Sequence, residues 1–495
     1  MRILLSGKEM KECDRVTIQE FGVSSMVLME RAALACVEEL YKSNADVSGK
    51  ILVVCGSGNN GGDGFAIARL LHLDGRDVTV HFAGKETSCT PETLQQKRIC
   101  EAYGVNFCSK PQIHEYTVII DALFGIGLSR EVTGTYAELI EKINRSNAFV
   151  LAADISSGVH SDTGAILGTA VRADLTVTFA FEKPGHYLGD GREYSGKTVL
   201  RQIGITKESL KGTAAHFHCY GREDIQRLPK RPGNAHKGSC GKVLLIAGSR
   251  EMCGAAVLSA KAAYCMGAGL VRVFTDACNK PVIQQSIPEA LVNCCDDGCK
   301  ENLGEFLDWA DAVVIGPGLS MKKKKLEILS QVLKFCSKPL ILDADALNLT
   351  AAHDLDLTAY RGEILVTPHL GEMARLCQKT IQEIRTDLPA AACEFAKKSR
   401  AVCVLKDAGT VVSDGSTLYV NTSGNSGMAT GGSGDVLAGM LGALAAQQMP
   451  LYDAARLGVY LHGWAGDAAA KQKAMRSMLA SDIIEGLSEV LKYAE

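Results

Sequence analysis

The stretch ILVVCGSGNNGGDG, residues 51–64, decides how the first part of the chain folds. Its first five residues are an apolar run typical of a buried strand. The glycines that follow allow a close backbone turn before a helix that we expect to begin near Phe65. Helical periodicity marks 26–41 and 65–73, and further strand-like runs lie at 78–82, 117–121, 149–154 and 175–179. This alternation predicts an α/β fold with a Rossmann-like, doubly wound parallel sheet.

A second series of strands follows a break in the pattern. Residues 207–232 are polar, and the alternation of strand, glycine turn and helix then starts again at 242–247. Later apolar runs end in polar or glycine-bearing loops and lie at 312–315, 339–343, 364–367 and 401–406. We therefore predict two α/β domains, 1–212 and 225–495, joined by a linker at 213–224.

The composition is that of an ordinary globular protein. Of 495 residues 46% are hydrophobic, and the net charge of −3 favours neither nucleic acid nor a membrane surface as a partner. The 18 cysteines include no Cys-x-x-Cys pair, and the cluster Cys294, Cys295 and Cys299 lacks nearby histidines, so we expect no metal there. Free thiols and the lack of a signal peptide predict a cytoplasmic protein.

Polar side chains at strand ends predict a site in the first domain. A nicotinamide-binding Rossmann unit should end its second strand in Asp or Glu, but this strand closes with Phe82-Ala83-Gly84, which disfavours a conventional dehydrogenase. Asp121 and Asp154 end later strands, and parallel topology should bring Asn60, Asp121 and Ser157 to one rim. Their oxygens suit a monovalent or divalent cation; helix capping is the alternative for each carboxylate.

The most informative stretch of the second domain is GNSGMATGGSGD, residues 424–435. Successive glycine N–H groups at a helix N-terminus form an anion hole suited to a transferring phosphoryl group, and Asp435 is placed to take a proton from a hydroxyl. The alternative is a structural turn in which Asp435 caps the helix. No Walker pattern is present, so a P-loop nucleotidase is excluded. Residues 406–410 and His369 also follow strands and suit ligand contacts.

These motifs resemble a known family. The first 212 residues are similar to the NAD(P)H-hydrate epimerase domain through NNGGDG at 59–64, DALFGIG at 121–127 and DISSG at 154–158, with Ser156 where the family usually has proline. The resemblance implies a potassium ion held by Asn60, Asp121 and Ser157. It also implies that the hydrated dinucleotide contacts Asn59, Asn60, Gly61, Gly62, Asp63, Gly125, Ile126, Gly127, Leu128, Ser129, Arg130, Glu131 and, at its ring, Asp154.

Residues 225–495 resemble the NAD(P)H-hydrate dehydratase branch of the ribokinase-like fold. The matching motifs include NAHKG at 234–238, GPG at 316–318, PHLGE at 368–372 and the 427–435 segment; Ser426 replaces a usual proline. The resemblance implies substrate contacts at Ala255, Gly318, His369 and Asp435. It also implies nucleotide contacts at Lys406, Asp407, Ala408, Gly409, Thr410 and Gly434.

The combined resemblance implies metabolite repair. The first domain is expected to interconvert the R and S hydrates NADHX and NADPHX, and the second to dehydrate the S form with ADP, giving AMP and phosphate. We expect Mg²⁺ with the nucleotide, catalytic roles for Asp435 and Asp154, and a homo-oligomer. Two alternatives remain at this point: a ribokinase-like kinase for a vitamin precursor, and a non-catalytic binding module in the N-terminal half.

Overall fold

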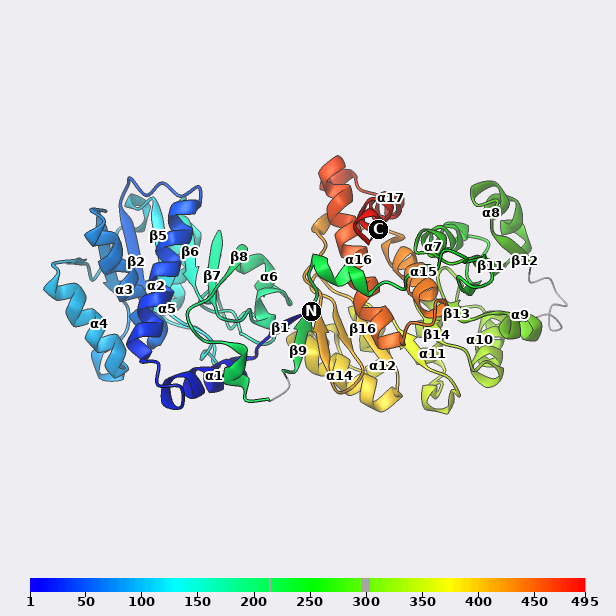
Figure 1. The fold of residues 1–495 in the computed structure, drawn as a ribbon, viewed down its shortest axis with the longest axis horizontal. Coiled ribbons are helices and arrows are strands. Elements are labelled where there is room, and N and C mark those ends of the chain that lie inside the picture. Colours follow the sequence, from blue (N-terminus) through cyan, green and yellow to red (C-terminus); the bar gives the residue numbers. More distant parts are fainter. Residues whose placement is uncertain (213–214, 295–302, 495) are drawn as a thin grey trace. The chain divides into compact units, whose positions relative to one another are not determined.

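The computed structural model describes residues 1–212, 215–294 and 303–494, which form two compact units (Figure 1). One unit is Ile3–Phe217, and the other is His218–Glu495 together with Met1–Arg2. Cys295 and Cys299, considered above as part of a cysteine cluster, lie outside the described residues. Among the described helices, none is long and apolar enough to cross a membrane.

The first unit is built on a parallel sheet of seven strands, in the order β4-β3-β2-β5-β6-β7-β8. Each central strand is buried on both faces, as expected where helices cover both sides of a parallel sheet. The strands are β2 (Ile51–Cys55), β3 (Val78–Phe82), β4 (Asn106–Phe107), β5 (Val118–Ala122), β6 (Phe149–Ala153), β7 (Leu175–Phe179) and β8 (Lys197–Arg201). The helices are α1 (Gly7–Gln19), α2 (Ser25–Lys42), α3 (Asn59–Leu73), α4 (Pro91–Ala102), α5 (Thr135–Asn144) and α6 (Gly191–Tyr194). The doubly wound sheet is confirmed, with two more strands, β4 and β8, than the sequence indicated.

The helix after the first glycine motif begins earlier than predicted. Helix α3 starts at Asn59, so the Asn-Asn-Gly-Gly segment is its first turn and not a loop. The glycines are needed there because α3 lies very close to the sheet: a Cβ at Gly61 would be 2.0 Å from the carbonyl oxygen of Gly56. A Cβ at Gly64 would be 2.6 Å from that of Ala122. Close helix–strand packing, more than loop flexibility, therefore explains these glycines.

The second unit contains a mixed sheet in the order β1-β9-β18-β17-β16-β15-β14-β13-β10-β11-β12. Its centre is parallel, while β17 is antiparallel to β16 and β18. The strands are β1 (Arg2–Leu4), β9 (Phe217–Cys219), β10 (Lys242–Ile246), β11 (Leu270–Thr275), β12 (Leu291–Cys294), β13 (Ala312–Ile315), β14 (Leu340–Leu342), β15 (Ile364–Val366), β16 (Val402–Leu405), β17 (Val411–Ser413) and β18 (Leu418–Val420). The predicted linker at 213–224 thus includes β9; the assignment of a function to each range stays a prediction.

Helices α7 and α15 cross in close contact beside this sheet. They bring Ser259 and Gly439 together so tightly that a Cβ at Gly439 would lie 2.0 Å from the carbonyl oxygen of Ser259. The helices of the unit are α7 (Cys253–Cys265), α8 (Lys280–Ser286), α9 (Leu303–Trp309), α10 (Lys323–Phe335), α11 (Asp345–Ala352), α12 (Leu370–Cys377), α13 (Ile381–Thr386), α14 (Leu388–Ser399), α15 (Ser433–Ala446), α16 (Leu451–Gln472) and α17 (Ala480–Leu491).

This crossing predicts a large stability loss on substitution of its glycine. Gly439→Leu should lower the free energy of unfolding by about 3 kcal/mol, because the side chain can be accommodated only if two buried helices separate. The matched control is Gly304→Ala on α9, where no atom of the described residues, apart from the adjoining residues and the helix's own backbone, lies within 4 Å of the added Cβ. Urea unfolding of both variants checks this; equal stability for Gly439→Leu and wild type would contradict the described packing.

Candidate functional site

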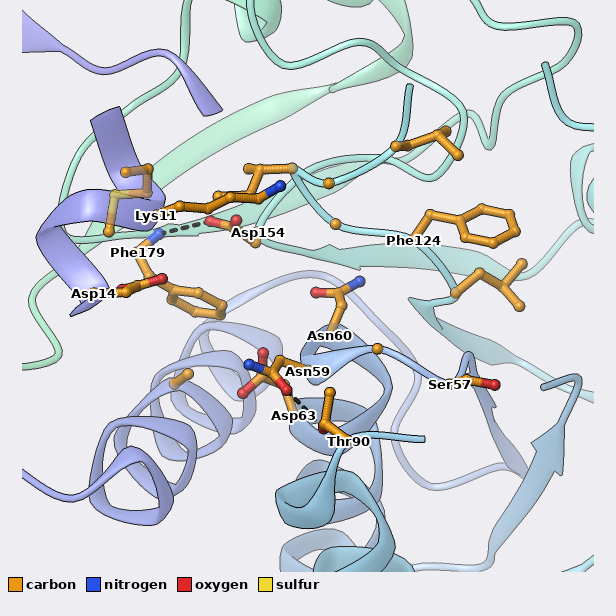
Figure 2. Close-up of a pocket in the computed structure, with 18 of the residues that line it drawn as sticks. Lys11, Asp14, Ser57, Asn59, Asn60, Asp63, Thr90, Phe124, Asp154 and Phe179 are labelled. Carbon is orange, nitrogen blue, oxygen red and sulfur yellow. Dashed lines mark hydrogen bonds between the residues drawn. The ribbon is translucent and has the colours of Figure 1, made fainter. Parts of the chain in front are cut away.

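A cavity of about 1230 Å³ opens at the carboxyl ends of the strands of the first unit. Asp154 follows β6, and Asn59, Asn60 and Asp63 come from the first two turns of α3 (Figure 2). Most of the substrate-contact residues expected from the sequence line this cavity, namely Asn59, Asn60, Asp63, Gly125, Ile126, Gly127, Leu128, Ser129, Arg130, Glu131 and Asp154. Gly61 and Gly62 do not line it, because they lie buried in the helix–sheet packing.

The oxygen-bearing residues expected to hold a cation lie beside this cavity. Asp121 accepts hydrogen bonds from both the backbone N–H and the Oγ of Ser157, at 2.8 and 2.6 Å. Burial raises the pKa of Asp121 to about 6, against the lowering effect of these bonds. Asn60 is in contact range of the Gly125 segment, and its buried Nδ2 has no hydrogen-bond partner among the described residues. The topology thus brings Asp121 and Ser157 together and leaves Asn60 with an unsatisfied amide nearby.

Asp154 has an unusual backbone and a buried ionic partner. Its φ is 66°, a conformation that non-glycine residues adopt rarely and mostly at functional sites. Its Oδ1 accepts from the ammonium of Lys183, whose side chain is completely buried and also donates to Thr178 Oγ1 at 2.8 Å. The Nε2 atom of His186 lies 3.0 Å from the backbone carbonyl oxygen of Asp154, and burial lowers the pKa of His186 to about 4. The imidazole is therefore neutral and shares a hydrogen bond with the strained backbone.

The cavity is also lined by Lys183 and Asp14, which were not among the expected site residues, and by Asp63, which was expected as a substrate contact. Lys183 lies 29 residues after its partner Asp154, in a segment without a glycine-rich motif. Asp14 on α1 and Asp63 on α3 both line the same cavity. Burial, followed by the charge of Asp154, raises the pKa of Asp14 to about 6 and that of Asp63 well above its usual range.

In the second unit, the glycine-rich segment forms the expected helix N-terminus. Gly432 caps α15 with φ 93°, and Asp435 lies in the first turn, with its backbone oxygen accepting from Ser259 Oγ at 2.9 Å. Burial, reinforced by the nearby charge of Asp343, raises the pKa of Asp435 to about 7. Asp435 is therefore poised to exchange a proton near neutral pH, as a general base requires.

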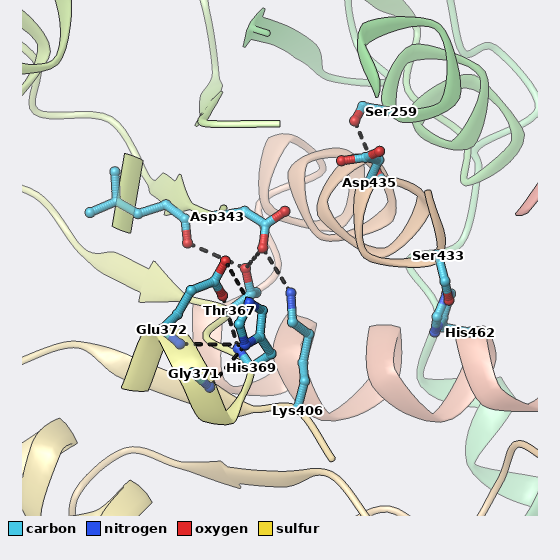
Figure 3. A network of polar contacts seen from close by, with 11 residues as sticks. Ser259, Asp343, Thr367, His369, Gly371, Glu372, Lys406, Ser433, Asp435 and His462 are labelled. Atoms are coloured by element: carbon cyan, nitrogen blue, oxygen red, sulfur yellow. Dashed lines mark hydrogen bonds and ion pairs between the residues drawn. The ribbon is translucent and has the colours of Figure 1, made fainter. Parts of the chain in front are cut away.

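A buried ionic network stands beside this helix end (Figure 3). Asp343, which directly follows β14, accepts from Lys406 Nζ at 2.9 Å and from Thr367 Oγ1 at 2.6 Å. The same ammonium lies 3.3 Å from the position of a Cβ at Gly434, so it faces the N-terminal turn of α15. Exposed amides and a lysine that converge on one place can hold a phosphate.

The remaining predicted contacts of this site surround it. A Cβ on Gly318 would be 2.8 Å from that of Ala255, so these two residues lie together. The backbones of His369 and Lys406 pair in an isolated parallel β-bridge. His369 caps α12: its Nδ1 accepts from the backbone of Gly371 at 3.0 Å, and the ring remains half-exposed. Residues 407–410 connect β16 to β17. The structure thus groups the predicted residues of each unit at one edge of its sheet.

The ionic network predicts a stability deficit that one further substitution should relieve. Lys406→Met should lower the unfolding free energy by about 3 kcal/mol, because Asp343 would remain buried without its counter-ion. Adding Asp343→Leu removes that charge and should recover much of the loss. Urea unfolding of the single and double variants measures this coupling. A double variant less stable than Lys406→Met would contradict the described network.

Comparison with known proteins identifies similar sequences over both units. Residues 243–489 match the family model for NAD(P)H-hydrate dehydratase, and residues 25–185 match the model for the YjeF-related protein N-terminus. The bifunctional NAD(P)H-hydrate repair enzyme Nnr of Coxiella burnetii is 38% identical over 98% of this chain and 99% of its own length. The Escherichia coli enzyme of the same name is 36% identical, with 98% and 93% covered.

Solved structures match the second unit. A ribokinase-like superfamily protein from Enterococcus faecalis has a TM-score of 0.52 and 32% identity, covering 57% of this chain and 98% of its own. An ADP/ATP-dependent NAD(P)H-hydrate dehydratase from Bacillus subtilis, co-crystallised with ATP and Mg²⁺, has a TM-score of 0.50 and 30% identity, covering 57% and 100%. The ribokinase-like fold predicted for the C-terminal half is confirmed.

Proposed function

The chain belongs to the family of bifunctional NAD(P)H-hydrate repair enzymes, and on that premise we propose how its two sites divide the work. The enzyme combines an epimerase with an ADP/ATP-dependent NAD(P)H-hydrate dehydratase. The epimerase site is the cavity of the first unit, and the dehydratase site is the N-terminus of α15 with its ionic network. The observation that carries this division is Asp435, a half-buried carboxylate in the first turn of a glycine-capped helix, with a pKa near 7.

The dehydratase must convert a poor leaving group into a good one. Hydroxide does not leave readily from C6 of the hydrated ring, whereas phosphate does. Asp435 takes the proton of the C6 hydroxyl, and the oxygen attacks the β-phosphoryl group of ADP, which releases AMP. Backbone N–H groups of 432–434 and the Lys406 ammonium hold the transferring phosphoryl oxygens. Phosphate then leaves C6 and a proton is lost from C5, so that the ring regains its C5=C6 double bond.

The other dehydratase contacts are proposed from the family resemblance. Ala255, Gly318 and His369 contact the hydrated dinucleotide, while Lys406, Asp407, Ala408, Gly409, Thr410 and Gly434 bind the nucleotide. The Bacillus subtilis relative co-crystallised with ATP and Mg²⁺ supports the use of a nucleotide with Mg²⁺ by this unit. When bound, Mg²⁺ would neutralise phosphoryl charge. ADP as the donor for this chain, in preference to ATP, remains part of the proposal.

In the epimerase, Asp154 contacts the hydrated ring, and Asn60, Asp121 and Ser157 hold a potassium ion. Their donor set fits such an ion, because a buried carboxylate, a hydroxyl and an amide supply hard oxygen ligands. Potassium would supply positive charge that orders the loops around the cavity. The substrates are NADHX and NADPHX, and assembly as a homo-oligomer in the cytoplasm stays a prediction.

The direct test of both activities is recovery of NADH from a mixture of R and S NADHX with ADP and Mg²⁺. The near-ultraviolet absorbance of NADH should reach the value for complete conversion, with AMP released in equal amount, because R must be epimerised before it is dehydrated. Recovery that stops at the S fraction would contradict the epimerase assignment. No nucleotide-dependent recovery would contradict the dehydratase assignment.

Asp435→Asn should separate the two activities. Loss of the base should lower the rate of S-NADHX dehydration by about 10²- to 10⁴-fold, while R-to-S conversion, measured by chromatography, stays at the wild-type rate. Asp453→Asn is the matched control, since Asp453 is exposed on α16 and pairs with Arg456. Normal dehydration by Asp435→Asn would show that another group removes the proton.

The pKa of Asp435 also predicts the pH dependence of dehydration. A base acts in its ionised form, so the dehydratase kcat/KM should fall about tenfold for each pH unit below about pH 7 and level off above it. Initial rates with pure S-NADHX and saturating ADP measure this profile. A kcat/KM that stays constant on acidification well below pH 7 would contradict Asp435 as the base.

A further inference from the structure

Three carboxylates surround one space in the epimerase cavity, although a single base would need only one. Asp154 projects from the end of β6, Asp63 from α3 and Asp14 from α1, and Figure 2 shows Asp154 and Asp63 on opposite sides of the open space. Lys183 forms an ion pair with Asp154 alone among them. Neither Asp63 nor Asp14 has a side-chain hydrogen-bond partner among the described residues. The three groups are therefore not equivalent, because only one has a buried cation.

We propose that Asp63 is the proton donor of the epimerase and acts as a pair with Asp154, the proton acceptor, across the hydrated ring. This assignment rests on the epimerase activity proposed above and adds a second catalytic residue to it. Lys183 is a positioning residue that holds the carboxylate of Asp154 in place through their ion pair. Asp14 contributes negative charge that favours the protonated form of Asp63.

The electrostatics of the cavity agree with these roles. Burial is the main reason that the pKa of Asp63 is raised well above its usual range, and the charges of Asp154 and Asp14 raise it further. The other titratable group facing Asp63 is the buried thiol of Cys36 from α2, whose own pKa is raised by burial, so it is neutral as well. The raised pKa favours the protonated, proton-donating form of Asp63, whereas Asp154 has the ammonium of Lys183 beside it as an ionic partner.

The reaction that this pair can perform is ring opening and reclosure. The C6 hydroxyl proton passes to Asp154, C6=O forms as the C6–N1 bond breaks, and the electron pair left on N1 takes the proton of Asp63. Rotation about C5–C6 presents the other face of the aldehyde to N1. Attack by N1 then returns its proton to Asp63, and the oxygen recovers a proton from Asp154. The product is the opposite epimer, with no other reactant consumed.

The experiment uses the full chain without nucleotide, so that dehydration does not compete, and follows R-to-S conversion of NADHX against an enzyme-free blank. The wild-type rate should fall on the alkaline side as Asp63 ionises. Asp63→Asn should lower the rate about 100-fold and abolish this alkaline limb. Asp74→Asn, at the far end of α3 where Asp74 bonds to Tyr41, is the matched control. An Asp63→Asn enzyme with the wild-type rate and alkaline limb would overturn the proposal.

A second variant keeps the test decisive if Asp63→Asn does not fold. Asp14→Asn removes one of the charges that keep Asp63 protonated, so the alkaline limb should move to lower pH; an unmoved limb would contradict the proposed coupling.

In water enriched in ¹⁸O, ring opening should retain the substrate oxygen above the blank, whereas label in every product molecule would overturn the bond-breaking step. A wild-type enzyme that does not epimerise at all would refute the proposed function itself.

Discussion

Both sites depend on one arrangement, a lysine that is buried or largely covered and is paired with the aspartate that follows a parallel strand. Lys183 pairs with Asp154 after β6, and Lys406 pairs with Asp343 after β14. An ammonium removed from water is costly unless a nearby carboxylate and further hydrogen bonds compensate it. The ammonium group of the lysine is therefore held beside the carboxylate. The aspartate itself is held in place because it directly follows its strand. Each pair thus fixes one positive and one negative charge at the edge of its sheet.

The surroundings of each ion pair give the neighbouring carboxylates, Asp435 and Asp63, different raised pKa values. Asp435 lies near Asp343 and Lys406 but has no cation of its own, and burial keeps its pKa close to neutrality. Asp63 lines the cavity of the first unit, where burial raises its pKa well above its usual range. The same residue type can therefore serve as a base in one unit and as an acid in the other. This difference depends on burial and on the distance to the lysine, not on the local sequence.

Local sequence was sufficient to predict the central strands of both sheets, but not outer strands such as β4, β8 and β11. Apolar runs such as 51–55 and 312–315 coincide with strands because buried parallel strands need continuous apolar residues. The start of α3 was misplaced because glycines were interpreted as a loop, although they serve close packing inside a helix. Lys183 could not be predicted, since its partner lies on a different strand end and a lone lysine has no periodic or spacing signal. The grouping of Asp121 with Ser157 was predictable because parallel topology alone brings them together.

The crossing of α7 and α15 at Gly439 determines how the dehydratase meets its substrate. Backbone touches backbone there, so the separation of the two helices does not depend on side chains that can change rotamer. Their first turns carry Ala255 and Asp435, and the fixed separation of the two helices keeps these residues at a fixed distance from each other. In the proposed dehydratase the hydrated ring would enter with its hydroxyl already directed at Asp435. A molecule of similar chemistry but greater thickness would be excluded by the skeleton of the enzyme itself, before any reactive group could act on it.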